Sequence, residues 1–240
     1  MPIAVALAVA LAAGAGAFAQ RLSGIGFSLI VAPSLALVTG PRDGIALTNL
    51  LVIVVALAVF AASARHVDKA KLRVLGPAGL AGVVPGVIVF RLLPVGPLQV
   101  AVGIVTGLGL TAVVAAPRLR ARPRLTTTMG AGAVSGFTTA VAGAGGPALT
   151  VYAVATDWPQ PRFAATCQLN YAIQAAAALA VKGLPPLPFA VLATALAAAL
   201  SGLTAGHLAA ARISGARVRH AAIGLAALAT LATVIRGLSA

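Results

Sequence analysis

Long apolar stretches separated by short polar breaks dominate the chain. The stretches run about 17–25 residues, the length of helix that crosses a hydrocarbon core about 30 Å thick. They show no alternation of polar and apolar positions, so strands are not expected. Because lipid leaves backbone polar groups to be satisfied internally, the pattern predicts an all-α polytopic membrane protein. Full spans are expected at 44–63, 73–90, 95–116, 163–181, 184–210 and 218–238.

Two further apolar segments, 2–39 and 127–156, are each broken by glycine. One helix over 2–39 would be about 57 Å long, nearly twice the roughly 30 Å core. The Gly-x-Gly at 24–26 and the Gly/Pro cluster at 143–147 offer points of reversal. We expect each segment to return to the side it came from, either as re-entrant half-helices or as a short hairpin.

The two halves of the chain carry the same landmarks in the same order. Gly-x-Gly occurs at 24–26 and 143–145, and Pro-Arg at 41–42 and 161–162, so both offsets are about half the chain. A hairpin plus three spans in each half would make the second half run upside down, the inverted-repeat plan of many secondary transporters. The expected parts are a first repeat over 1–117, a basic linker over 118–126 and a second repeat over 127–240.

Composition supports the membrane interpretation. Sixty per cent of the residues are apolar and 8% are charged, against about 25% charged in soluble domains, and the mean hydropathy is +1.06. Residues 1–20 imitate a signal peptide but lack the basic start that one requires. We expect them to belong to the first repeat.

The net charge of +14 does not indicate nucleic-acid binding, because no basic stripe with interleaved aromatic residues is present. The basic residues cluster between apolar stretches, as the positive-inside bias of membrane insertion produces. We therefore expect a multi-pass protein of the inner or plasma membrane, with the lipid bilayer as its surroundings. Loops 65–73, 118–124 and 212–219, with Arg162, are expected in the cytoplasm, and Arg42, Arg91 and Lys182 outside.

The two glycine breaks are the candidate binding site. Interrupted helices leave backbone amides unpaired and present the partial positive charge of a helix N-terminus, which suits an anion. The alternative is close helix packing, which small residues also serve in membranes. The candidate residues at the breaks are Ser23, Gly24, Gly26, Ser28, Gly143, Gly145, Gly146 and Thr150.

Polar residues at the start of the following spans are expected to face the breaks, although they would equally serve as hydrogen bonds between helices. Arg21, at the tip of the first hairpin, has two interpretations, neutralising an anion or reaching solvent. The acids Asp43, Asp68 and Asp157 fall in loops, so no carboxylate relay is expected inside the membrane. No metal or other cofactor is expected. The polar candidates are Thr48, Asn49, Thr166, Cys167, Gln168 and Asn170.

Both halves resemble the TauE/SafE family of sulfite and organosulfonate exporters, through a Gly-rich break followed by the Arg-x-x-x-Ala-Thr-type start of a span. The resemblance implies export of a small sulfur-containing or carboxylate anion across the inner membrane, with or without a coupling proton or ion. Phe27 and Ser28 depart from the family's glycines, and Asn49 and Cys167 replace a common serine. The stretches that carry it are GAGAFAQRLSGIGFSLIVAPSLAL, PRDGIALTNLLVIV, GAVSGFTTAVAGAGGPALTVYAV and PRFAATCQLNYAI.

Other classes of protein fit less well. The sequence has no phosphate-binding loop, metal-spaced Cys/His cluster or nucleophile with a partner base, so an enzyme is not expected. A non-transporting scaffold or assembly factor is the main alternative, and it would not need two matched breaks. A cation or metal transporter should show paired carboxylates or histidines inside its spans. The sequence leaves the substrate, the direction of transport and the oligomeric state open.

Overall fold

The computed structural model describes residues 3–23 and 27–239, and within this part all regular structure is helical. Each of the six expected spans is found as one helix, with ends within about five residues of those expected. Two 3-10 turns, Ala64–His66 and Ala116–Arg118, accompany the helices. The ten α-helices are α1 (Ile3–Ser23), α2 (Phe27–Thr39), α3 (Pro41–Ala61), α4 (Lys69–Leu92), α5 (Val95–Ala115), α6 (Leu125–Ala142), α7 (Gly146–Ala155), α8 (Gln160–Lys182), α9 (Phe189–Ala209) and α10 (Gly215–Leu238).

Among the described residues, six helices are long and apolar enough to cross a membrane, namely α1, α3, α4, α5, α9 and α10. Helix α8 is as long, but it carries a run of polar residues along its first half. Helices α2 and α7 are apolar and short, with 13 and 10 residues. The chain is therefore a multi-pass membrane protein in which a long and a short helix form each glycine-broken segment.

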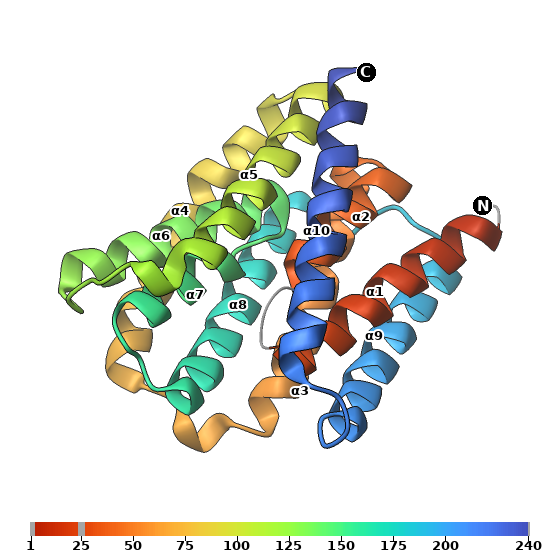
Figure 1. Cartoon of the computed structure of the whole chain (residues 1–240). Coiled ribbons are helices and arrows are strands. Elements are labelled where there is room, and N and C mark those ends of the chain that lie inside the picture. The colour runs from red at the N-terminus through yellow and green to blue at the C-terminus, as the bar shows by residue number, and fades with distance from the viewer. Residues whose placement is uncertain (1–2, 24–26, 240) are drawn as a thin grey trace.

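The two halves exchange their first helices. Helix α1 lies along α9, and α6 lies along α4 (Figure 1). Added Cβ atoms at Gly202 and Gly136 would overlap the carbonyl oxygens of Gly14 and Gly79, so the paired backbones are in direct contact. Close approach of this kind is favoured in lipid, where helices gain stability from dispersion contacts rather than from leaving water.

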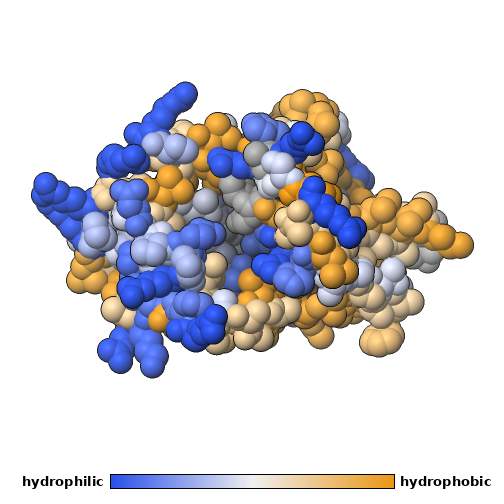
Figure 2. Space-filling view, turned by 60° about the horizontal axis from the view of Figure 1, so that its bottom comes forward, coloured by the Kyte–Doolittle hydropathy of each residue, from blue (hydrophilic) through white to orange (hydrophobic). Residues whose placement is uncertain are grey.

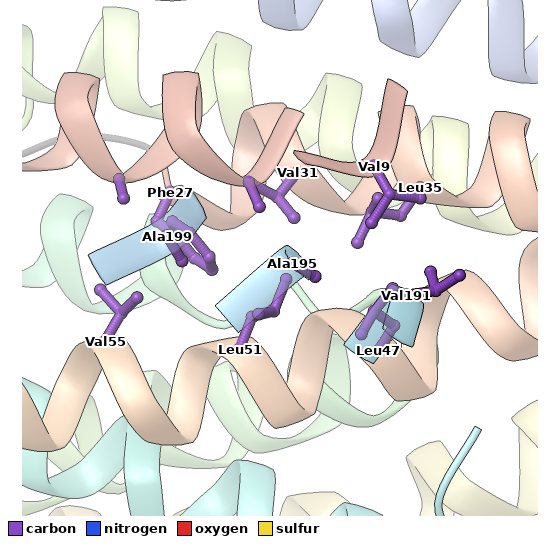
Figure 3. Packing of buried hydrophobic residues seen from close by; sticks show 12 residues of the cluster. Val9, Phe27, Val31, Leu35, Leu47, Leu51, Val55, Val191, Ala195 and Ala199 are labelled. Atoms are coloured by element: carbon purple, nitrogen blue, oxygen red, sulfur yellow. The ribbon is translucent and has the colours of Figure 1, made fainter. Parts of the chain in front are cut away.

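A cluster of buried aliphatic side chains fills the space between α1, α2, α3 and α9 (Figure 3). Val9 of α1, Val31 of α2 and Leu51 of α3 are among its fully buried members, and Ala195 and Ala199 bring α9 close to them. The cluster holds α2 against α1, which positions the first turn of α2 inside the molecule.

Basic residues gather at one end of the helices. This end, here called the basic face, is formed by the connections 62–68, 116–124 and 210–214. The linker is tied there by the Ala121 amide, which donates to the carbonyl of Ala155 at 2.8 Å. In Figure 2 the molecule is turned so that this end comes towards the viewer, and many hydrophilic side chains are seen there. The connections at 40, 93–94 and 183–188 lie at the other ends of the same helices, which we call the opposite face.

Candidate functional site between two helix tips

The break between α6 and α7 is a tight turn that only glycine accommodates easily. Gly143 ends α6 with a φ of 67°, in the left-handed region that a Cβ disfavours. Its amide donates to the Thr139 carbonyl at 2.9 Å, and the Ala144 amide donates to that of Thr138 at 3.2 Å. Helix α7 then begins at Gly146, with Pro147 in its first turn. The predicted interruption of the second segment is therefore present at 143–145.

The first turns of α2 and α7 face each other. A Cβ added at Gly146 would lie 3.7 Å from Ser28 Oγ and 3.9 Å from Tyr171 Oη. The Phe27 amide, which opens α2, donates to Gln20 Oε1 at 3.0 Å. No side chain caps the start of α7. The amide end of α7 is thus available for a ligand, whereas a first-turn amide of α2 is already bonded.

A cavity of about 350 Å³ lies between these two helix starts. Its walls come from the halves of α3 and α8 nearest the basic face, and it extends to the exposed residues Arg21 and Gln160 at that face. Thr139 and Gly143 form its floor, because they contact Asn49 and Thr48 of α3, which lie farther from the basic face than the α3 lining residues Val52 to Val59. The cavity therefore opens towards the basic face.

The cavity is electropositive. Arg21 is the one charged residue among the described residues that line it. Its Nη2 donates to Nδ1 of His207 in α9 at 2.7 Å, and this bond fixes the position of the guanidinium. The positive ends of the α2 and α7 helix dipoles add to this potential. With no carboxylate in the described lining, the cavity is suited to an anion.

A hydrogen-bond network supports the cavity floor. Ser135 and Thr139 of α6 both donate to Gln174 Oε1, at 2.9 and 3.2 Å. A Cβ added at Gly145 would overlap Thr139 Oγ1 and lie 2.7 Å from the Ser135 carbonyl oxygen. Gly145 therefore packs against this network, and Gly146 is the position from which a side chain would enter the cavity.

Half of the residues predicted from the sequence line the cavity. Thr48 and Asn49 lie against Gly143, within 2.9 and 3.6 Å of its added Cβ, but outside the lining. Ser23 ends α1 with its side chain outside the described part, where Gly24 and Gly26 also fall. The predicted residues that line the cavity are Ser28, Gly143, Gly145, Gly146, Thr150, Cys167 and Gln168.

Two predicted residues point elsewhere. Thr166 Oγ1 accepts from the Asp68 amide at 2.9 Å, just before α4. Asn170 is fully buried, and neither polar atom of its side chain has a hydrogen-bond partner among the described residues. Neither residue lines the cavity. Both belong to the helix interfaces around it.

Sequence reasoning missed Gln20, Thr139 and Tyr171. Tyr171 Oη donates to the Gly146 carbonyl at 3.3 Å, and Thr150 Oγ1 donates to the same oxygen at 3.0 Å. Thr139 precedes Gly143 by one helical turn, and this spacing was the available signal, because a side chain there must lie beneath the break.

A substitution at Thr166 can distinguish a structural role of this residue from a role in binding the anion. We expect Thr166→Val to destabilise the protein by about 1 kcal/mol, since it removes one hydrogen bond. Anion flux per inserted molecule should stay within about twofold of wild type. Thermal unfolding in detergent and flux in proteoliposomes check the two expectations, with Arg217→Ala on the basic face as the control. A large loss of flux at unchanged stability would contradict the supporting role.

A multi-pass helical protein in which the starts of two short helices meet at an electropositive cavity resembles a membrane transporter in its architecture. Comparison with protein families agrees. The chain belongs to the sulfite exporter TauE/SafE family, whose model matches residues 8–233. Searches of curated proteins and of solved structures returned no match.

Proposed function

We propose that the protein is a secondary transporter that exports a small anion, such as sulfite, an organosulfonate or a related carboxylate. The observation that carries the proposal is the convergence of Arg21 and the starts of α2 and α7 on one cavity without a described carboxylate. An oxyanion of a few atoms fits easily within a cavity of about 350 Å³. Ser28, Thr150 and Gln168 supply further hydrogen-bonding groups.

The packing of the helices supports an inverted repeat. Short connections make successive helices alternate in direction, so α1 and α6 run in opposite directions. Added Cβ atoms show that α1 is parallel to α9, since Gly14 meets Ala198 and Phe18 meets Gly206. Helix α6 is parallel to α4 in the same way. The first helix of each half thus lies along the fourth helix of the other half, as an in-plane pseudo-twofold axis predicts.

The side of the cavity supports export. Positive-inside bias makes the basic face cytoplasmic in an inner or plasma membrane, so the cavity opens towards the side from which an exporter takes its substrate. The opposite face is closed by bonds between helices. Arg42 donates to the Leu93 carbonyl at 3.0 Å, and Arg91 donates to the Val181 carbonyl at 2.6 Å.

The arginines at matching positions of the second half behave differently. Arg162 and Arg212 follow Arg42 and Arg91 by about half the chain, and both are exposed on the basic face. Within the described residues no hydrogen bond ties either of them to another helix. We interpret this asymmetry as the mark of one of the two end states of a transport cycle, in which the opposite face is closed and the cytoplasmic face is open.

The orientation yields a prediction about accessibility. Single cysteines at positions 42 and 162, placed in a Cys167→Ser background, should react with an impermeant thiol reagent from opposite sides of the membrane. Position 42 should react from outside, and position 162 only after the cytoplasmic side is exposed. Labelling of position 162 from outside intact cells would contradict the inverted arrangement.

Binding of the anion can be tested without transport. An anion at a hundred times its dissociation constant stabilises the folded protein by about 2.7 kcal/mol. We therefore expect methanesulfonate or sulfite to raise the melting temperature of the purified wild type relative to chloride at equal ionic strength. The control is Arg21→Met, in which this shift should shrink. Equal melting temperatures in all the anions would count against the cavity as the binding site.

A further inference from the structure

Lys182, the last residue of α8, is a partly buried cation on the far side of the cavity floor from the basic face. Its Nζ donates to the Ala140 carbonyl, in the last turn of α6. The same nitrogen lies 4.3 Å from the centre of the Phe90 ring. In the amide orientation that satisfies both neighbours, Asn49 accepts from Lys182 Nζ at 3.1 Å and donates to the Thr139 carbonyl at 3.3 Å.

These contacts leave the charge uncompensated. No ion pair joins Lys182 to a carboxylate within the described residues, and the three acids of the chain are Asp43, Asp68 and Asp157. The Ala140 carbonyl, the Asn49 side-chain amide and the Phe90 ring all interact with the ammonium group. None of them carries a full negative charge that would balance it. A partly buried cation without a counter-ion is costly in a membrane protein, and such residues typically mark the path of an ion.

One side chain, Asn49, connects Lys182 to the cavity floor. Thr139 and Gly143 form this floor, and Asn49 contacts both, through its bond to the Thr139 carbonyl and its position 3.6 Å from the added Cβ of Gly143. Asn49 also contacts the ammonium group. An anion moving from the cavity to the opposite face would meet Lys182 directly beyond Asn49 and Phe90.

We propose that Lys182 is a second anion-binding position, which receives the substrate on the opposite side of the cavity floor once Phe90 and Asn49 have moved aside. The proposal rests on the proposed function, since it assigns the outer part of the same transport path. Its ligand is the transported anion, held by the ammonium group with Asn49 as a neutral partner. Arg42, whose guanidinium carbon lies 5.6 Å from the centre of the Phe90 ring, is near enough to strengthen the local positive potential.

Arg236 provides a matched control. Arg236 also lies at the opposite face. Its Nη1 donates to the carbonyl of Leu37, near the end of the short helix α2. Unlike Lys182, it is exposed. If Lys182 served only to cap a helix end, removing either charge should have the same kind of effect.

The test measures sulfite exchange in proteoliposomes of known orientation, with sulfite varied on one side at a time. Lys182→Met should raise the half-saturating sulfite concentration on the opposite face by about tenfold, the factor for 1.4 kcal/mol. The value on the basic face should change by less than about twofold, because the cavity is intact. Lys182→Arg, which keeps the charge, should restore most of the affinity, and Arg236→Met should leave both values unchanged.

Equal changes on both faces, or no change on either, would overturn the proposal. Should Lys182→Met fail to insert, Phe90→Leu gives an independent measurement. Removing the ring that covers Nζ should lower the half-saturating concentration on the opposite face, and an unchanged value would overturn the proposal. Absence of any sulfite exchange by the wild type is a different result, because it refutes sulfite as the substrate of the proposed transporter.

Discussion

Replacing Gly146 by leucine should reduce anion flux per inserted molecule by at least about a hundredfold, which corresponds to losing about 2.7 kcal/mol of binding. A Cβ at this position meets nothing closer than Ser28 Oγ at 3.7 Å, and the backbone conformation is not one that requires glycine. The leucine side chain would therefore enter the cavity without displacing the backbone. It would also cover the amide end of α7, where the anion is expected to bind.

Gly130 provides the control in the preceding helix. An added Cβ there contacts nothing within 4 Å, so Gly130→Leu should transport like the wild type. Flux is measured in proteoliposomes and normalised to inserted protein. If Gly146→Leu inserts normally and retains wild-type flux, the cavity between α2 and α7 is not the transport site.

Replacing Gly136 by valine should have the largest effect on stability. Its Cβ would overlap the Gly79 carbonyl oxygen, and the neighbouring contact of Gly82 with Ala133 leaves α4 no room to shift. Overpacking typically costs about 1–3 kcal/mol, and we expect the upper end of this range because the two backbones are already in contact. For a chain of this length the melting temperature should fall by roughly 10 °C.

Gly130→Val is the matched control, because it makes the same substitution in the same helix at an open position. The measurement is the fraction of protein that stays monodisperse in detergent after heating. Similar melting temperatures for the two variants would show that α4 and α6 are not packed through their backbones.

The helices themselves were predictable from the sequence, because lipid allows a long apolar stretch few structures other than a helix. The break at 143–145 was also predictable, because the clustered Gly and Pro interrupt a segment otherwise suited to a helix. The first break lies at 24–26, outside the described residues.

The pairing of α1 with α9 and of α4 with α6 was not predictable. With 26 glycines in the chain, almost every helix offers a small-residue face, and the sequence does not show which faces meet. The side-chain directions at the break were equally hidden. Whether position 145 or 146 faces the cavity depends on the backbone dihedral angles of the turn. Thr166 and Asn170, predicted to face the breaks, do not line the cavity: Thr166 accepts from the Asp68 amide, and Asn170 is fully buried.

Transport itself is tested most directly by reconstituting the wild-type protein in liposomes loaded with sulfite, thiosulfate, an organosulfonate or a small carboxylate. The structure predicts that at least one sulfur oxyanion or sulfonate leaves these vesicles faster than it leaves protein-free vesicles. It also predicts that this excess disappears in Gly146→Leu and persists in Gly130→Leu. Correctly inserted wild-type protein that moves none of these anions above the protein-free rate would contradict the proposal that this cavity carries an anion.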